Sequence, residues 1–128
     1  MVKRLGALGA RPNMEISIAD KKLARAFTDD QECVRRYGSE QGKKLRIRLT
    51  TLQAAVSLAD LWPPNRGPER CHELTGDKAG IFSIDLKHPY RLLLRQISDA
   101  TKEQYPNERE RWERITSIEI IGIEDTHA

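Results

Sequence analysis

The chain is poor in cysteine, aromatic residues and long apolar runs. It contains two cysteines, and its aromatic fraction is only 5%. Cys33 and Cys71 stand in no CxxC or other ligand spacing, which argues against a disulfide framework or a zinc site and favours reduced thiols. No apolar run reaches the length of a membrane span, and the opening stretch MVKRLGALGARPNM lacks the apolar core of a signal peptide. These absences predict a cytoplasmic protein with no metal and no membrane partner.

Charged residues, by contrast, make up 32% of the 128 residues, with a net charge of +3. Residues 1–50 hold twelve Lys and Arg against six Asp and Glu, whereas residues 98–128 hold four against eight. A basic front and an acidic back predict a face that binds a polyanion and a separate surface for a different partner. The length suits one domain, which we expect at residues 14–128 after a flexible arm at residues 1–13.

The front of the domain predicts a strand followed by a helical hairpin. The segment MEISIAD at residues 14–20 alternates apolar and polar residues, as a half-buried strand does. Asp20 is a candidate N-cap for a short helix after it. A second helical segment begins at Asp29-Asp30 and ends at Gly38, a suitable C-terminal residue.

A longer helix is expected over about residues 40–58, because its leucines recur at helical spacing. Its basic residues lie largely away from that apolar stripe: Lys43, Lys44, Arg46 and Arg48. Such a cluster is most often the solvated side of a helix. Because all four residues carry the same sign, contact with RNA phosphates is a second interpretation.

Residues 71–97, CHELTGDKAGIFSIDLKHPYRLLLRQI, predict three strands joined by short turns. Apolar runs separated by a few residues with glycine or proline between them indicate hairpins. The segment therefore predicts an antiparallel meander, with His72 near one end of the sheet and Arg91 and Arg95 on a neighbouring strand. A histidine and two arginines gathered on a small sheet suit phosphate chemistry.

A polar insertion at residues 98–113 separates this meander from a last strand, RITSIEIIGIED. Pro106-Asn107 is expected to break any helix there, so we expect a solvated loop or hairpin extension. The near-continuous apolar character of the last strand predicts a central position covered by helices. The predicted fold class is α+β, with an N-terminal strand and a helical hairpin packed on an antiparallel sheet.

The block at residues 72–92 resembles the RelE/ParE superfamily of type II toxins, in particular its HigB-like branch, the plasmid maintenance killer or host-inhibition toxins. Those proteins carry H-x-L-K-G-D-[RK]-x-G-x-[YFW]-S-I, followed by a strand that begins [YW]-R-[LI]. From His72 this chain reads HELTGDKAGIFSI, and YRL follows at residues 90–92. The family ends on a D-Y-H triplet, where this chain has DTH at residues 125–127. In layout the resemblance covers roughly residues 14–128, and it implies a RelE-like fold.

The resemblance also implies an activity, the cleavage of messenger RNA on the ribosome without a metal or another cofactor. The ribose 2′-hydroxyl attacks the adjacent phosphate, which requires a base, a proton donor for the leaving 5′ oxygen, and cations. His72 and His127 would be base and acid in either order, with Asp125 orienting an imidazole or accepting a proton. Arg91 matches the family's strand arginine and would hold the scissile phosphate. Further candidate RNA contacts are Lys78, Arg95 and the four basic residues of the predicted long helix.

The partners that the resemblance implies are a HigA-like, helix-turn-helix antitoxin, the ribosome and messenger RNA. Operator DNA would be bound only through the antitoxin complex. An antitoxin segment that is disordered when free would fold over exposed apolar groups and the basic helical surface.

Two departures from the family pattern leave alternatives open. Thr75 replaces the family's lysine, and Thr126 replaces a tyrosine that offers a base a stacking surface. Losing one electrostatic stabiliser costs about two to three orders of magnitude in rate. The alternatives are a catalytically impaired relative that acts by protein or operator-DNA binding, and a ParE-like gyrase inhibitor, against which the histidines argue. In the plainer interpretation, Arg91 and Arg95 are ordinary cross-strand partners of carboxylates such as Asp85 or Glu119.

Overall fold

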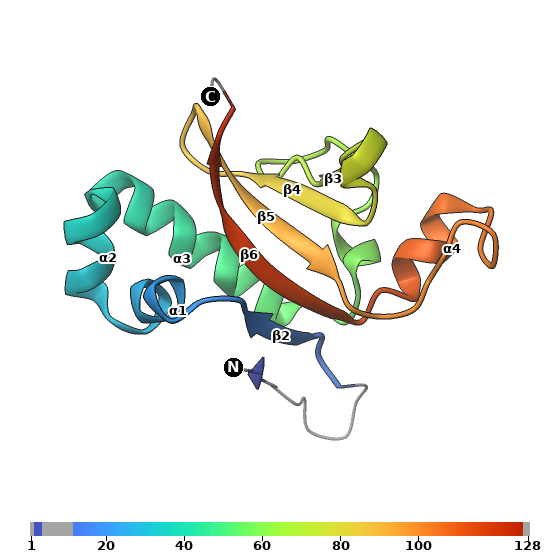
Figure 1. Cartoon of the computed structure of the whole chain (residues 1–128), viewed down its shortest axis with the longest axis horizontal. Coiled ribbons are helices and arrows are strands. Elements are labelled where there is room, and N and C mark those ends of the chain that lie inside the picture. The colour runs from blue at the N-terminus through green and yellow to red at the C-terminus, as the bar shows by residue number, and fades with distance from the viewer. Residues whose placement is uncertain (1, 4–11, 127–128) are drawn as a thin grey trace.

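The computed structural model describes residues 2–3 and 12–126, and its elements are labelled in Figure 1. Within these residues one six-stranded sheet has the order β1-β2-β6-β5-β4-β3. The strands are β1 (Val2–Lys3), β2 (Glu15–Ile18), β3 (His72–Glu73), β4 (Ile81–Asp85), β5 (Tyr90–Gln96) and β6 (Ser117–Asp125). Only β2 and β6 pair in parallel within this sheet of the described residues. The predicted antiparallel meander and last strand are confirmed, and the pairing of Val2–Lys3 with β2 was not foreseen for the N-terminal arm.

Three α-helices connect β2 to the meander, namely α1 (Lys21–Thr28), α2 (Asp30–Tyr37) and α3 (Ser39–Ala54). The Asp20 carboxylate accepts a hydrogen bond from the Leu23 amide at 2.8 Å and so caps α1. Asp29 caps α2 in the same manner. Gly38 follows α2 with a φ of +85°, a conformation that residues with a side chain rarely adopt. Glycine at this position therefore allows α2 to end and α3 to begin directly after it. These local signals place the helix starts as predicted.

The long helix stops at Ala54, four residues earlier than the predicted end at residue 58. Ala55 has extended backbone angles, and Ser57 starts a separate 3-10 helix, η1 (Leu58–Leu61), by accepting a hydrogen bond from the Ala59 amide. The side chain of Ser57 thus competes with continued α-helix at this position.

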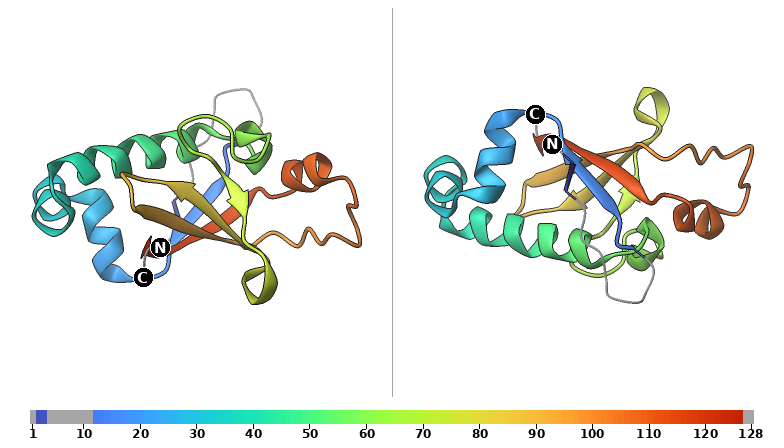
Figure 2. Two further views of the ribbon diagram at one scale, coloured as in Figure 1. Left: turned by 90° about the horizontal axis from the view of Figure 1, so that it is seen from above. Right: turned by 90° about the horizontal axis from the view of Figure 1, so that it is seen from below.

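The helices cover one face of the sheet, while a short 3-10 helix, η2 (Gly76–Lys78), lies on the other side (Figure 2). We call these the covered face and the open face. The covered face carries the buried apolar residues of alternate strand positions: Phe82, Ile84, Leu92, Leu94, Ile118 and Ile120. Leu23, Leu45 and Leu52 of the helices are buried with them. Each such side chain contributes about 1.5–3 kcal/mol by leaving water, so this layer holds the fold together.

Of the two alternatives predicted for residues 98–113, a solvated loop or a hairpin extension, the structure shows the second, because the segment joins the antiparallel strands β5 and β6. Its end forms α4 (Glu108–Glu113), which Asn107 caps by accepting a hydrogen bond from the Glu110 amide at 3.0 Å. Pro106-Asn107 therefore starts a helix instead of breaking one. The expectation was wrong because a residue that disfavours helix interiors is favoured at the position just before a helix.

Trp112 of α4 explains why the insertion is held against the domain. Its side chain is buried, and its ring meets Trp62 and Phe82 edge to face, with ring centroids 5.2 and 5.3 Å apart. Edge-to-face aromatic pairs contribute about 0.5–1.5 kcal/mol beyond their burial. Trp112 therefore belongs to the core, although most of the insertion around it is exposed.

Arg48 is a second correction to the sequence-based expectations. Its side chain is only 3% exposed, and it donates hydrogen bonds to the carbonyl oxygens of Asp85 (2.7 Å, from Nε) and Pro68 (3.1 Å, from Nη2). It joins α3 to β4 and to the loop before β3. Arg48 therefore serves the fold and does not belong to the exposed basic side of the helix, as Lys43, Lys44 and Arg46 do.

Candidate phosphate-binding site

The strand register places His72 and Arg91 on the open face. His72 pairs with Ser83, and Ser83 pairs with Leu93 of β5. Paired residues point to the same side of a sheet, and Arg91 lies two positions before Leu93, so it shares that side. Two strand spacings and two residues separate His72 from Arg91, which puts their Cα atoms about 12 Å apart. The two residues therefore share one surface, but β4 lies between their strands, which the sequence had predicted to be neighbours.

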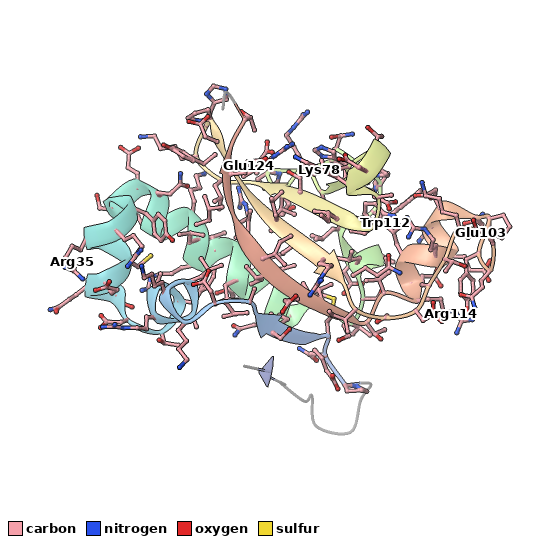
Figure 3. The ribbon with its side chains drawn as sticks, viewed as in Figure 1. Arg35, Lys78, Glu103, Trp112, Arg114 and Glu124 are labelled. Carbon is pink, nitrogen blue, oxygen red and sulfur yellow. The ribbon has the colours of Figure 1, made fainter. Side chains whose placement is uncertain are left out.

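The turn after β3 brings Lys78 onto the same face. Gly76 and Gly80 have φ of +70° and +90°, and the Leu74 amide donates to the Ile81 carbonyl at 2.8 Å, so the chain folds back on itself within a few residues. Lys78 lies in η2 between the two glycines. Its Nζ is 3.4 Å from Oε1 of Glu124 on β6, and Figure 3 shows the two side chains close together above the sheet.

Glu124 contacts Arg91, the residue that was predicted to hold the phosphate. Its Oε2 accepts a hydrogen bond from Arg91 Nε at 2.7 Å and lies 2.6 Å from Arg91 Nη2. The hydrogen bond from Arg91 holds the pKa of the Glu124 carboxyl below its usual range, and Lys78 acts in the same direction. The carboxylate is thus charged at neutral pH and bridges both cations.

Sequence reasoning selected Asp125 where the structure has Glu124. Arg91 pairs with Glu124, whereas Asp125 pairs with Tyr90 and so points to the opposite side of the sheet. The expectation that Asp125 lies beside Arg91 is therefore wrong, because the register places the preceding residue, Glu124, opposite Arg91. The available signal was the alternation of IIGIED, which puts only every second residue beside Arg91.

Thr126, the last of the described residues, follows β6 directly. Its backbone amide and its Oγ1 both donate to the Pro89 carbonyl, at 2.9 and 2.8 Å. The end of β6 is thereby fastened to the turn between β4 and β5. His127, the second predicted histidine, lies outside the described residues.

His72 has a defined protonation pattern. Its Nδ1 is 2.8 Å from the Arg70 carbonyl oxygen. A carbonyl only accepts hydrogen bonds, so Nδ1 carries a proton, and in the neutral ring Nε2 is left to accept one. Ser83 lies beside it in the register, and its buried Oγ has no hydrogen-bond partner among the described residues.

Carboxylates balance the cations of the open face. Arg70 Nε lies 3.3 Å from Asp85 Oδ2, and Arg95 pairs with Glu119. Together with Lys78, Arg91 and Glu124, four cations thus face three carboxylates within the part of the chain that the structure describes. The plainer interpretation is confirmed for Arg95 and Glu119, while Arg91 takes Glu124 instead of Asp85. The face is a network of ion pairs and not a bare basic patch.

The remaining candidate RNA contacts lie elsewhere. Lys43, Lys44 and Arg46 are exposed on α3, which covers the opposite face of the sheet (Figure 2), and Arg46 is paired with Asp30. The predicted basic residues therefore divide between two surfaces, of which only the open face contains His72 and Arg91.

Two further classes of site were sought in residues 2–3 and 12–126. No group of three His, Cys, Asp or Glu side chains in these ranges is placed to hold a metal ion. None of the helices there is long and apolar enough to cross a membrane.

Comparison with known proteins gives little beyond this geometry. No family model matches the sequence, and no curated protein does. Among solved structures, the chain is similar to a YoeB/ParE toxin from Agrobacterium tumefaciens, with a TM-score of 0.47 and 16% sequence identity. That similarity covers 86% of this chain and 95% of the other.

Proposed function

We propose that this chain is a RelE/ParE-like toxin of the HigB type, the toxic component of a type II toxin–antitoxin pair. We further propose that it cleaves messenger RNA on the ribosome. The observation that supports this most strongly is the gathering of His72, Lys78 and Arg91 on one open sheet face. All three belong to the single sequence block that resembles the toxin family, although they come from three different elements.

The proposed chemistry needs no metal. Arg91 and Lys78 bind the scissile phosphate and stabilise the charge that develops on it. Nε2 of His72 accepts the proton of the ribose 2′-hydroxyl, because Nδ1 is committed to the Arg70 carbonyl. Since His72 takes the role of base in this scheme, His127 takes the other role that the family resemblance implies for the pair and donates a proton to the leaving 5′ oxygen. Asp125 has at most an indirect role in this scheme, since it pairs with Tyr90.

Induced expression tests the proposal directly. The wild type should arrest growth and produce cleaved messenger ends on translating ribosomes. His72→Ala should lower cleavage by about 10²- to 10⁴-fold, and Arg91→Lys should also lower it, because an ammonium cannot reproduce the planar fork. His88→Ala, in the exposed β4–β5 turn, is the matched control and should cleave like the wild type. Cleavage that persists undiminished in a His72→Ala/Arg91→Lys double variant would refute the catalytic assignment.

A second candidate is favoured by the ion-pair network. A catalytically impaired relative that poisons by protein binding would have no need for free cations, and Arg91 and Arg95 are both paired with glutamates. This candidate predicts growth arrest without new messenger ends. The same expression experiment therefore separates the two functions.

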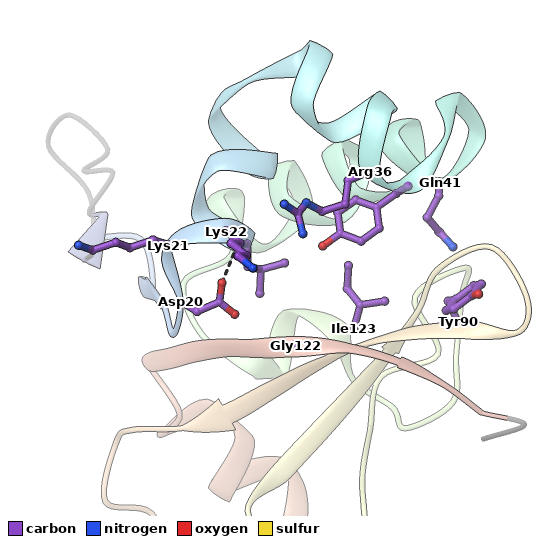
Figure 4. Close-up of a pocket in the computed structure, with 10 residues that line it drawn as sticks. Asp20, Lys21, Lys22, Arg36, Gln41, Tyr90, Gly122 and Ile123 are labelled. Atoms are coloured by element: carbon purple, nitrogen blue, oxygen red, sulfur yellow. Dashed lines mark hydrogen bonds between the residues drawn. The ribbon is translucent and has the colours of Figure 1, made fainter.

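The antitoxin partner has a candidate binding groove on the covered-face side. A cavity of about 890 Å³ lies between α1, α2, the start of β5 and the last part of β6 (Figure 4). Leu23, Tyr37 and Ile123 give it an apolar lining, while Lys21, Lys22 and Arg36 add positive charge. We propose that an acidic segment of the antitoxin with apolar side chains folds into this groove.

Co-expression with the product of the neighbouring gene tests this contact. A Lys22→Glu/Arg36→Glu variant should lose co-purification with that product, because like charges then oppose the acidic segment. Lys44→Glu, an exposed lysine of α3 outside the groove, is the control and should retain it. Equal retention by both variants would exclude the groove as the contact surface.

A further inference from the structure

The geometry points to Glu124 as a built-in competitor for the phosphate site. We propose that its carboxylate occupies the position that an RNA phosphate takes between Arg91 and Lys78, so that RNA binds only by displacing it. This inference rests on the proposed function in one respect, namely that the ligand of the open face is a nucleic-acid phosphate. Glu124 thereby sets how tightly the chain binds RNA.

The contacts of Glu124 resemble those of a bound oxyanion. One carboxylate oxygen faces two nitrogens of the Arg91 guanidinium, at 2.7 and 2.6 Å, and the other faces the Lys78 ammonium at 3.4 Å. Guanidinium forks bind carboxylates and phosphates by the same charge-assisted hydrogen bonds. An incoming phosphate therefore needs no new site, only the departure of the side chain that already fills it.

Glu124 is also free to leave. Its side chain is 30% exposed, and it stands near the end of β6, two residues before the fastening at Thr126. A glutamate has three rotatable bonds, so it can turn towards solvent without a backbone change. Arg91, in contrast, is 21% exposed and remains in place on β5 between β4 and β6.

An internal competitor lowers the apparent affinity of a site. The apparent affinity equals the affinity of the vacant site multiplied by the fraction of molecules in which the site is vacant. The strength of the partly exposed pair of Glu124 and Arg91 lies between that of an exposed ion pair and that of a buried hydrogen bond to a charged group, so we expect the site to be vacant in roughly one molecule in 5 to 30. Removal of the competitor should therefore tighten RNA binding by about 5- to 30-fold.

The test measures binding of a fluorescein-labelled octamer of uridylate to the purified chain at fixed salt. Glu124→Gln removes the charge and leaves at most a neutral amide oxygen to accept from Arg91, which is a weaker contact than the charge-assisted one. Glu124→Asp keeps the charge but withdraws the carboxylate by one methylene, so it separates loss of contact from loss of charge. Glu110→Gln is the matched control, because it makes the same change in charge at an exposed glutamate of α4, outside the strands of the open face. A thermal melt of each variant verifies that it is folded.

Glu124→Gln should bind the octamer about 5- to 30-fold more tightly, Glu124→Asp should gain a smaller factor, and Glu110→Gln should gain less than twofold. Arg91→Ala should abolish the gain when it is combined with Glu124→Gln. Equal gains in the Glu124→Gln and Glu110→Gln variants would reduce the effect to net charge and overturn the proposal, as would no gain at all. If the Glu124 variants show these gains but the wild-type chain neither arrests growth nor cleaves RNA, the proposed function is refuted and the competitor role stands.

Discussion

Removing the carboxylate of Glu73 should lower the free energy of unfolding far more than removing an exposed carboxylate does. Glu73 of β3 contacts the guanidinium of Arg111 of α4, and the two side chains are 10% and 2% exposed. In Glu73→Ala the Arg111 charge stays buried, with only the Gln96 Oε1 (3.1 Å) and the Ala100 carbonyl (3.4 Å) still accepting from Nη1. Breaking a buried pair by removing one partner costs about 3–5 kcal/mol. Because two acceptors remain, we expect the lower end, about 3 kcal/mol.

Such a loss is a large part of the roughly 5–15 kcal/mol that holds a domain of this kind folded. It should lower the midpoint of thermal unfolding by about 10–15 °C. The measurement is urea and thermal unfolding of the purified variant.

The control for this prediction is Glu108→Ala. Glu108 also faces Arg111, with Oε1 3.6 Å from Nε, but its side chain is 44% exposed. Water screens such a pair, so its removal should cost less than about 1 kcal/mol. A Glu73→Leu/Arg111→Met variant should recover most of the loss, because an apolar pair of similar volume replaces a buried ion pair without a penalty. If Glu73→Ala and Glu108→Ala destabilise equally, the insertion is not anchored by a buried charge and the reasoning fails.

Three further predictions concern single positions. Arg48→Met should cost about 2–3 kcal/mol in unfolding free energy, because two carbonyls lose their donor, whereas Lys44→Met on the same helix should stay within about 0.5 kcal/mol. Burial raises the pKa of the Cys71 thiol to about 12. This thiol therefore stabilises the fold fully below about pH 8.5 and progressively less as the pH rises, so Cys71→Ala should flatten the fall of the melting temperature between about pH 9 and 11. Thr75→Lys should steepen the salt dependence of RNA binding by about 0.7 in log–log slope; if Thr50→Lys on α3 does the same, the open face is not the RNA site.

The elements that the sequence predicted well are those specified by neighbouring residues. The helix boundaries were predictable because a cap or a positive φ acts within a few positions of the chain. These boundary residues are Asp20, Asp29 and Gly38. The block at residues 72–92 carries its own turns, and so it foretold the meander and the shared face of His72 and Arg91. Local chemistry of this kind can be read without knowing the rest of the chain.

The errors concern residues whose partners are distant in sequence. Arg48 and Arg111 look like solvated charges, since nothing near them in the chain offers a buried acceptor. Their acceptors lie 37 and 38 positions away, at Asp85 and Glu73. Helical periodicity identifies the apolar side of a helix. It does not show that a segment distant in sequence packs against the polar side and buries a charged residue there. The same limit hid Trp112, whose aromatic neighbours belong to other elements.

The open face shows why a count of cations does not measure affinity for a polyanion. Among the described residues, Arg91, Lys78 and Arg95 are all engaged by carboxylates of β6, so a phosphate gains only the difference between its own bond and the one it replaces. That difference depends on Glu124, which the register sets opposite Arg91, and a shift of one residue would have put Asp125 there instead. The acidic end of the sequence thus acts on the basic face within the same sheet. Its carboxylates pair with cations from the middle of the sequence, whereas the exposed Lys43 and Lys44 of the basic front half lie on α3, over the other face (Figure 2).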